Sequence, residues 1–399
     1  MTAVPIAGLV PAHLLRTAVR ARRAPRRLTT GTARTIGWIT GAARAYDAGV
    51  ARVAIRAARL RLRGWRVGDL ALLGLLDPAT GPAAERWAVR RREVLRLQEA
   101  LNPAGSVHTT DDKIRFSALC EERGLPAVTI VAVLERRSDA ALTARAWAAA
   151  LQERAPVEMV VKPAGGTLAT GVRILRRTGF GVADHAGGER SWLAMATELA
   201  QGPGAALVVQ PRLRTHPELL RLTGRDVLQC LRVVTLLDED GRGRVLYTAL
   251  RIAVGDSDVD SFRAPWAGST GNLIARVEED GRLAAPVGVA PGGFGLVRVP
   301  RHPDTGLLLE GAAVPQVREA RALAVRAAEA FAPLRTVGWD VAPTAEGPVL
   351  LEGNVWWGAT GDPDGALLPV RAALYEAVAG RGLSAAGARP PRPPRARSR

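Results

Sequence analysis

The chain has few cysteines, few aromatic side chains and no long apolar run. Its two cysteines, Cys120 and Cys230, lie far apart in apolar surroundings within 399 residues. They cannot build a cysteine metal site, and buried free thiols in a reducing cytoplasm are the plain interpretation. No stretch of about 18 apolar residues is free of charge, which argues against a membrane-spanning helix. Pro5 and Pro11 interrupt the apolar start, and arginines follow it rather than precede it, so we expect no signal peptide and a cytoplasmic location.

Lysine is almost absent, although the chain is strongly basic. Of 55 Lys and Arg residues, only Lys113 and Lys162 are lysines. Because arginine supplies the positive charge everywhere else, a remaining lysine indicates a position where a guanidinium does not serve. A compact ammonium on a flexible stem suits close contact with a crowded polyphosphate. Asparagine is similarly scarce, with Asn102, Asn272 and Asn354 as its three occurrences.

The formal net charge of +17 is concentrated at the two ends. Residues 1–100 hold 19 arginines and 6 acids, whereas residues 381–399 hold 6 arginines and no acid. Such ends can contact an anionic partner or membrane surface, although arginine-rich coding bias together with solubility is the plainer explanation. An arginine-rich nucleic-acid-binding protein is a third interpretation. It predicts aromatic side chains among the arginines for base stacking, and only Trp38, Tyr46 and Trp65 occur there, so we expect no specific nucleic acid.

Strand-like and helix-like segments mix without strict alternation, which favours an α+β fold. Helical spacing is expected within residues 1–64 and over 67–76, 83–101, 112–123, 140–153, 192–200 and 314–331. Strands are expected over 128–134, 158–162, 172–175, 206–210, 231–237, 245–254, 295–299 and 349–352, with a further strand before the turn at 344–347. Residues 384–399 are rich in Pro and Arg and cannot build a core, so we expect disorder there.

A glycine-rich loop follows one of the two lysines. An apolar strand ends at Lys162, and Gly165, Gly166 and Gly171 lie in the loop after it. Glycines let backbone N–H groups approach a phosphate closely. No Gly-Lys-Ser/Thr follows, so this is not the P-loop pattern. Taken alone, the segment also fits a structural hairpin.

Two carboxylates and an amide occur on a predicted hairpin near the end of the chain. Asp340 lies on one strand, and Glu352 and Asn354 lie on the next. Residues two apart on a strand point to one face, and the turn between the strands allows Asp340 to lie opposite Glu352. Such hard oxygen donors suit Mg²⁺, completed by phosphate and water oxygens. The alternative, a polar strand end in solvent, explains Asn354 poorly because Trp356 and Trp357 follow it.

Together the two motifs resemble the ATP-grasp superfamily, whose signature is a strand-borne lysine before a flexible glycine-rich loop and a later Asp and Glu-x-Asn. The intervening segments are similar to one branch, the alpha-L-glutamate ligase-related or sugar-transfer associated ATP-grasp proteins. The resemblance covers about residues 65–380. The residues that carry it are Leu101-Asn102-Pro103, 111–116, Val209-Gln210-Pro211, His216-Pro217, 231–235, Arg251, Asp260, 302–306 and the stretch from Trp339 to Asn354.

This resemblance implies an ATP-grasp fold, in which two α+β subdomains grip ATP, preceded by a helical N-terminal region. The expected division is a basic helical region over 1–64, a helical lead-in over 65–112, a first subdomain with the glycine-rich loop over 113–205, a second subdomain with the metal site over 206–383, and a tail over 384–399. The branch has Asp-Asn-Phe and then two adjacent glycines, where this chain has Asp260-Ser261-Phe262 and Gly268-Ser269-Thr270-Gly271. That departure lies on the expected acceptor side and leaves the substrate class open.

The resemblance also implies roles for single residues. Lys113 and Lys162 would reach the α and β phosphates, and the loop from Gly165 to Gly171 would close over them. The strand with Gln210 would lie beside adenine, and His216 would either approach the ribose or cap a turn. Arg232 and Arg251 are the catalytic candidates, because guanidinium forks match phosphoryl oxygens, although each could equally be a surface arginine. Asp340, Glu352 and Asn354 would hold Mg²⁺.

The implied chemistry is ATP- and Mg²⁺-dependent activation of a carboxylate as an acyl phosphate, followed by attack of an amine or similar nucleophile. The expected partners are therefore a small carboxylate and a nucleophile, with cell-surface or sugar-conjugate biosynthesis as one setting. The alternatives are an ATP-grasp phosphotransferase that is not a ligase and a nucleotide-binding module. The sequence shows no obvious general base.

Overall fold

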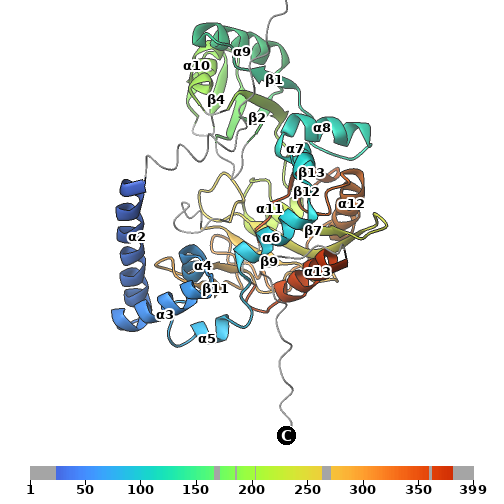
Figure 1. Ribbon diagram of the computed structural model, residues 1–399. Coiled ribbons are helices and arrows are strands. Elements are labelled where there is room, and N and C mark those ends of the chain that lie inside the picture. The colour runs from blue at the N-terminus through green and yellow to red at the C-terminus, as the bar shows by residue number, and fades with distance from the viewer. Residues whose placement is uncertain are drawn as a thin grey trace, which may run out of the picture.

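The computed structural model describes the backbone of residues 24–165, 171–184, 187–202, 204–262, 271–358 and 362–380, and side chains from residue 35 onward. Within these ranges the chain forms a helical N-terminal unit and two antiparallel sheets, each covered by helices (Figure 1). This is the α+β architecture expected from the mixed strand and helix patterns. None of the helices described here is long and apolar enough to span a bilayer.

The N-terminal unit consists of short helices around a core of its own. These are α2 (Ala24–Ala45), α3 (Val50–Leu62), α4 (Val67–Leu72) and α5 (Gly81–Ala84). Val53 and Leu60 of α3 pack in one cluster with Trp65 and Leu70. The unit therefore continues past residue 64, and the boundary expected there is wrong because it would cut this core.

The N-terminal unit rests on a hairpin of the second sheet. Phe294 and Leu296, from the hairpin of β10 (Val287–Val289) and β11 (Leu296–Arg298), pack against its core. Gly41 of α2 makes this contact possible, because a Cβ there would lie 2.9 Å from the Phe294 ring. Gly295 donates its backbone N–H to the carbonyl of Ala71 at 2.7 Å.

The first sheet has six strands in the order β1-β6-β2-β3-β4-β5. Their bounds are β1 (Ala132–Glu135), β2 (Glu158–Pro163), β3 (Arg173–Arg177), β4 (Val182–Asp184), β5 (Glu189–Arg190) and β6 (Ala206–Pro211). Helices α9 (Ala140–Arg154) and α10 (Trp192–Gln201) pack on it through Trp147, Leu151 and Met195. Because β6 pairs with both β1 and β2, it belongs to the first sheet, and the subdomain boundary expected at 205/206 falls after Pro211 instead.

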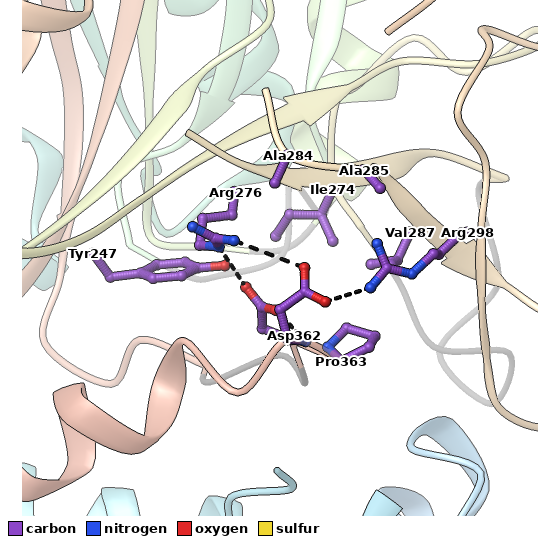
Figure 2. Close-up of a pocket in the computed structure, with 10 residues that line it drawn as sticks. Tyr247, Ile274, Arg276, Ala284, Ala285, Val287, Arg298, Asp362 and Pro363 are labelled. Carbon is purple, nitrogen blue, oxygen red and sulfur yellow. Dashed lines mark hydrogen bonds and ion pairs between the residues drawn. The ribbon is translucent and has the colours of Figure 1, made fainter. Parts of the chain in front are cut away.

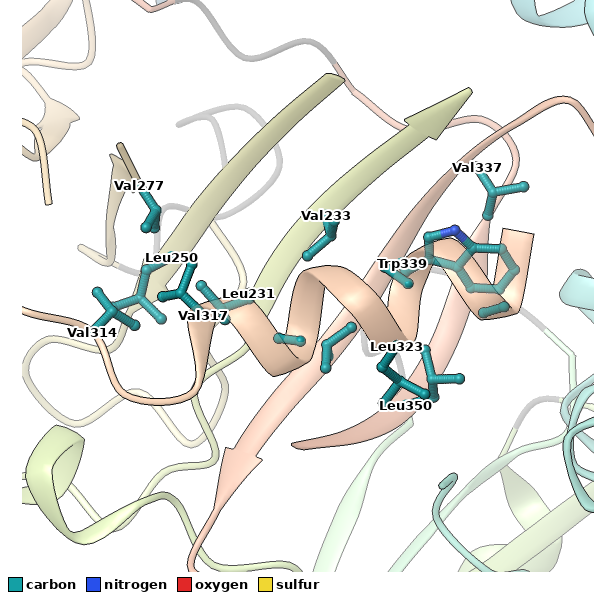
Figure 3. Close-up of a cluster of buried hydrophobic side chains, with 14 of the residues drawn as sticks. Leu231, Val233, Leu250, Val277, Val314, Val317, Leu323, Val337, Trp339 and Leu350 are labelled. Carbon is teal, nitrogen blue, oxygen red and sulfur yellow. The ribbon is translucent and has the colours of Figure 1, made fainter. Parts of the chain in front are cut away.

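The second sheet has seven strands in the order β11-β10-β9-β8-β7-β12-β13. Their bounds are β7 (Leu231–Leu237), β8 (Gly243–Ile252), β9 (Leu273–Arg276), β10 (Val287–Val289), β11 (Leu296–Arg298), β12 (Thr336–Thr344) and β13 (Gly347–Asn354). Helix α12 (Val317–Ala330) covers one face, where Val233, Leu323 and Trp339 belong to the largest core cluster (Figure 3). Helix α8 (Lys113–Glu122) joins the same core through Phe116.

Two helices cover part of the other face of the second sheet. Helices α6 (Arg91–Leu101) and α13 (Leu367–Gly380) pack there against Val234 and Leu236. Asn102, at the end of α6, donates to the carbonyl of Thr336 at 2.9 Å and accepts from the N–H groups of Arg335 and Thr336. These bonds fix α6 to the start of β12 and account for one of the three asparagines.

Several elements differ from the sequence prediction. The helix expected over 83–101 is interrupted after α5 and resumes at Arg91 as α6. The strand expected from residue 128 begins at Ala132, and Val128 instead donates to Leu350 of β13. The short strands β4, β5, β9 and β10 and the helices α7 (His108–Asp111), α11 (Pro217–Thr223) and α13 were not predicted. Most are too short for a periodic pattern.

Candidate active site

One row of residues crosses the second sheet on the face opposite α12. Direct strand partners share a face in an antiparallel sheet. The pairs are Glu352 with Asp340, Asp340 with Arg232, Arg232 with Ala249, and Ala249 with Arg276. We call these five residues the polar row. The predicted carboxylates and one predicted arginine are thus brought together by register alone.

A β-bulge in β13 puts Glu352 into this row. Val341 pairs with Leu350, but the next pair toward Asp340 is Asp340 with Glu352, so Leu351 is an extra residue. Leu350 and Val341 both belong to the core beneath α12. In a regular strand Glu352, two residues after Leu350, would face that same core. The extra residue instead turns Glu352 and Asn354 toward the polar face.

Asp340 is buried and held by two arginines. Arg232 donates to its carboxylate in a bidentate manner, with Nε 2.5 Å from Oδ1 and Nη2 3.1 Å from Oδ2. Arg251 of β8 donates to Oδ2 at 3.0 Å. Burial raises the pKa of Asp340, but the two guanidinium groups outweigh it and lower that pKa to about 2. Asp340 is therefore ionised at any physiological pH.

Asn354 completes the group. Its amide nitrogen lies 3.4 Å from Asp340 Oδ2 and 3.3 Å from Glu352 Oε1. Rotation of the amide would present its oxygen at the same point, so the donor set fits a hard cation such as Mg²⁺. In the described ranges no three His, Cys, Asp or Glu side chains are placed to hold a metal ion. A cation here would need Asn354 and further oxygens from nucleotide and water.

Gly338 leaves room for the Arg232 side chain. It pairs with Asn354 on one side and Val234 on the other. A Cβ at this position would lie 3.0 Å from Arg232 Cδ and 2.8 Å from Trp357 Cβ. Arg232 can thus lie flat along β12 toward Asp340 only because residue 338 has no side chain.

The two lysines come from segments that are bonded to each other. Lys113 begins helix α8, and its backbone N–H donates to the carbonyl of Ala164, just after β2, at 2.9 Å. Asp112 caps α8 and bridges to Gly165. Burial lowers the pKa of Lys162, nearby Lys113 lowers it further, and Glu352 opposes both. Lys162 on the first sheet therefore lies within electrostatic reach of Lys113 and of the carboxylates on the second sheet.

The remaining nucleotide-binding candidates are placed less completely. Gly165 ends one described range and Gly171, with φ of 78°, begins the next, whereas Gly166 lies outside the described residues. Gln210 is buried on β6, whose main chain pairs with β1 and β2. The pairing with β1 ends at Val209, so Gln210 is paired on the β2 side alone. His216 caps α11 by accepting from the N–H of Glu218 at 3.2 Å, which matches the capping alternative.

Asp260 joins the site from the acceptor-side segment. It is buried, accepts from the N–H of Cys230 at 2.9 Å, and lies 3.9 Å from Arg251. Burial raises the pKa of Asp260, whereas Arg251 lowers it. Arg251 therefore lies between two carboxylates, Asp260 and Asp340. The sequence signal for Asp260 was its position in the Asp-Ser-Phe motif, which replaces the Asp-Asn-Phe of the related branch.

A small hollow continues the polar face toward the edge of the sheet (Figure 2). Arg276, the last member of the polar row, donates to Asp362 at 3.2 Å. Arg298 of β11 pairs with Asp364. Burial and Asp362 raise the pKa of Tyr247, which borders the same hollow. Sequence reasoning missed this group, because its members are spread over more than a hundred residues and carry no local motif.

Comparison with known proteins gives a family and a set of distant structural likenesses. The family described as sugar-transfer associated ATP-grasp matches residues 92–363. Among curated proteins, none matches the chain. The VanG D-Ala:D-Ser ligase from Enterococcus faecalis is 12% identical with a TM-score of 0.40, over 68% of this chain and 61% of that one. The D-alanyl-alanine synthetase A from Vibrio cholerae is 12% identical with a TM-score of 0.42, over 70% and 68%. The D-alanine-D-alanine ligase from Coxiella burnetii is 12% identical with a TM-score of 0.41, over 72% and 66%. The chain thus spans less than two thirds of the Enterococcus protein's length.

Proposed function

Because the chain belongs to the sugar-transfer associated ATP-grasp family, we propose that it is an ATP- and Mg²⁺-dependent ligase that activates a carboxylate. The observation that carries this proposal is the convergence of Asp340, Glu352 and Asn354 beside two arginines, within reach of Lys162. Cationic groups for phosphates and oxygen donors for a cation are the two requirements of phosphoryl transfer. The polar face supplies both.

Different residues of the site would bind the nucleotide phosphates, the cation and the transferring phosphoryl group. Lys113 and Lys162 bind the phosphates that stay with ADP, while Asp340, Glu352 and Asn354 would hold Mg²⁺. When bound, the cation neutralises charge on the phosphoryl oxygens. Arg232 and Arg251 are kept in place by Asp340, and their remaining N–H groups can face the transferring phosphoryl group.

The reaction proceeds in two steps. A substrate carboxylate oxygen attacks the γ-phosphorus, and the bond to the ADP oxygen breaks, which leaves an acyl phosphate. An amine or hydroxyl then attacks the acyl carbon, loses its proton, and phosphate departs. Arg251 can stabilise the oxygens that gain charge in both steps. The hollow near Arg276 and Arg298 offers hydrogen-bonding groups for the second substrate on the same face.

Release of ADP and phosphate from Mg·ATP tests the proposal. We expect release to require both a carboxylate and a nucleophile, and a screen of such pairs identifies them. Lys162→Ala should reduce nucleotide binding by tenfold or more, since one charged contact to phosphate is lost. Arg176→Ala, an exposed change on the neighbouring strand β3, is the matched control.

The same assay separates the alternatives. Phosphorylation of an acceptor without joining of two substrates would indicate a phosphotransferase. Binding of ATP without turnover in any substrate mixture would indicate a nucleotide-binding module. Unchanged ATP affinity in Lys162→Ala would show that Lys162 does not bind the phosphates of ATP.

A further inference from the structure

Helix α3 carries two apolar faces, and among the residues that the structure describes only one of them is covered. Val53, Ala57 and Leu60 are buried in the core of the N-terminal unit. On the opposite side, Ala51, Ile55, Ala58 and Leu62 are exposed and recur at helical spacing, so they form one stripe along the helix. Ile55 is 64% exposed and Leu62 is 89% exposed. We call these four residues the exposed stripe.

Arginines flank the exposed stripe on both sides. Arg52 and Arg59 lie along one edge, and Arg61 lies along the other, as follows from 100° of rotation per residue. Arg52 and Arg59 form no ion pair with any residue that the structure describes, and Arg61 donates only to the carbonyl of Trp65. By contrast, Arg56 and Arg63 are paired with Glu85. The stripe's own arginines are thus available to an outside partner.

The surrounding charge selects the kind of partner. From residue 24 to residue 66 the sequence has ten arginines and one acid, Asp47. An anionic surface is therefore attracted, whereas a second copy of the chain would bring like charges together in a symmetric contact. A nucleic acid would satisfy the arginines, but it would leave Ile55 and Leu62 without an apolar environment and would find no exposed aromatic ring on α3 for stacking.

We propose that α3 docks this protein on a bilayer containing anionic lipids, with the exposed stripe at the level of the headgroups. The apolar side chains enter the boundary between headgroups and acyl chains, and Arg52, Arg59 and Arg61 reach outward to lipid phosphates. The N-terminal unit packs on the hairpin before Arg298, so docking through α3 would tether the second sheet to the membrane. This role is independent of the reaction proposed above.

Vesicle sedimentation of the full-length protein tests the proposal. The vesicles are phosphatidylcholine alone and an equal mixture of phosphatidylcholine and phosphatidylserine. We expect binding to the mixed vesicles that weakens with added salt, and little binding to phosphatidylcholine. Ile55→Ser with Leu62→Ser should weaken binding by at least about tenfold. Arg52→Gln with Arg59→Gln should weaken it by about fivefold per arginine.

Two controls match these changes at other exposed positions. Phe180→Ser removes an apolar side chain that is 87% exposed on the first sheet, and Arg318→Gln removes an exposed arginine on α12. Both should bind vesicles like the wild type. All variants should keep the wild-type thermal midpoint, because each changed side chain faces solvent.

Three results would overturn the proposal. The first is an absence of binding to the mixed vesicles. The second is binding that needs Arg52 and Arg59 but not Ile55 and Leu62, which indicates adsorption by charge alone or, where duplex DNA displaces the protein, nucleic-acid binding. The third is a dimer in sedimentation equilibrium that Ile55→Ser with Leu62→Ser converts to a monomer, which shows that a second copy covers the stripe.

Discussion

At the scale of single residues, the two carboxylates of the site have different partners. Two arginines donate hydrogen bonds to Asp340, and neither of them donates to Glu352. Asp340 accepts from Arg232 and Arg251, whereas Glu352 accepts from the Asn354 amide at 3.3 Å. Asp340 thereby positions the arginines, and in the proposed site it would also face the cation. Glu352 is the carboxylate with free capacity to accept a metal ion.

We expect Glu352→Gln to abolish Mg²⁺-dependent turnover while the protein stays folded. The change is nearly isosteric, but it removes the charge that a cation needs, so ADP release should fall by roughly a hundredfold or more. Glu346→Gln, in the exposed turn of the same hairpin, should have no effect. Wild-type turnover in Glu352→Gln would show that the metal site lies elsewhere.

Asp340→Asn should be destabilising, and the effect should depend on pH. The variant leaves two arginines without their buried partner, which costs about 3 kcal/mol near neutral pH. Since the folded pKa of about 2 is below the unfolded value of 3.8, the stability that Asp340 contributes is present above pH 3.8 and is lost as the pH falls toward 2.

Urea unfolding of wild type and Asp340→Asn at pH 7, 5, 4 and 3 measures this difference. We expect the free energies of unfolding of the two proteins to differ by a constant amount down to about pH 4 and by a smaller amount below it. A difference in the free energy of unfolding that is the same at every pH would mean that Asp340 is not the group that titrates.

At the scale of elements, helices α6 and α13 are joined by one hydrogen bond between their side chains. Tyr375 of α13 donates to Glu93 of α6 at 2.7 Å. Burial and this bond raise the pKa of Tyr375 to about 12. The pair lies beside the apolar contacts that hold both helices on the second sheet.

Tyr375→Phe should lower the free energy of unfolding by about 1 kcal/mol at neutral pH. The folded pKa lies above the unfolded value of 10, so this stability is present below pH 10 and is lost as the pH rises toward 12. Thermal midpoints of the two proteins should therefore converge between pH 10 and pH 12. Parallel midpoints over that range would contradict the role of the hydrogen bond.

Many of the longer helices and strands could be predicted from the sequence. In a long segment, the spacing of apolar residues shows which side chains are buried and therefore which element forms. Helix α9 and strand β7 have bounds within one residue of the prediction. The bulge at Leu351 could not be predicted, because hydrophobic alternation does not show which strand gains a residue. The expected opposition of Asp340 and Glu352 is confirmed, but a hairpin without the bulge would have placed Leu351 opposite Asp340.

Short strands and domain boundaries escaped prediction for a different reason. Strand β9 has four residues, too few for a pattern, yet it carries Arg276 into the polar row. The strand at 206–210 was assigned to the second subdomain, but β6 pairs with β1 and β2 of the first sheet, and such long-range pairing is not visible in the sequence. The scarcity of lysine and asparagine is what singled out Lys113, Lys162 and Asn354 as candidates in the sequence.

At the scale of the whole molecule, helix α8 connects the two sheets. Its first residue, Lys113, is bonded to the end of β2, and Phe116 and Cys120 lie in the core of the second sheet. A nucleotide held by Lys113 and Lys162 on one side and by Asp340 and Glu352 on the other would join the same two parts. Nucleotide binding should therefore stabilise both sheets together.

We expect hydrogen exchange to report this coupling. Mg²⁺ with a non-hydrolysable ATP analogue should slow amide exchange at the end of β2, at the start of α8 and in the β12–β13 hairpin together. At a ligand concentration about 100 times Kd the stabilisation should be about 2.7 kcal/mol. Lys162→Ala should remove the protection from both sheets, and protection confined to one sheet would contradict a shared site.

In the proposed site, the pairing of Asp340 with two guanidinium groups would also determine the order in which the cation and the nucleotide bind. The carboxylates Asp260, Asp340 and Glu352 are outnumbered by two arginines and two lysines, so the nucleotide-free site offers a divalent ion no net attraction to offset the loss of its hydration shell. The cation must therefore enter together with the triphosphate, whose negative charges it accompanies. Calorimetric titration with MgCl₂ should show no saturable heat in the free protein and clear binding once the ATP analogue is present. Saturable magnesium binding before nucleotide would mean that the arginines release Asp340 unaided.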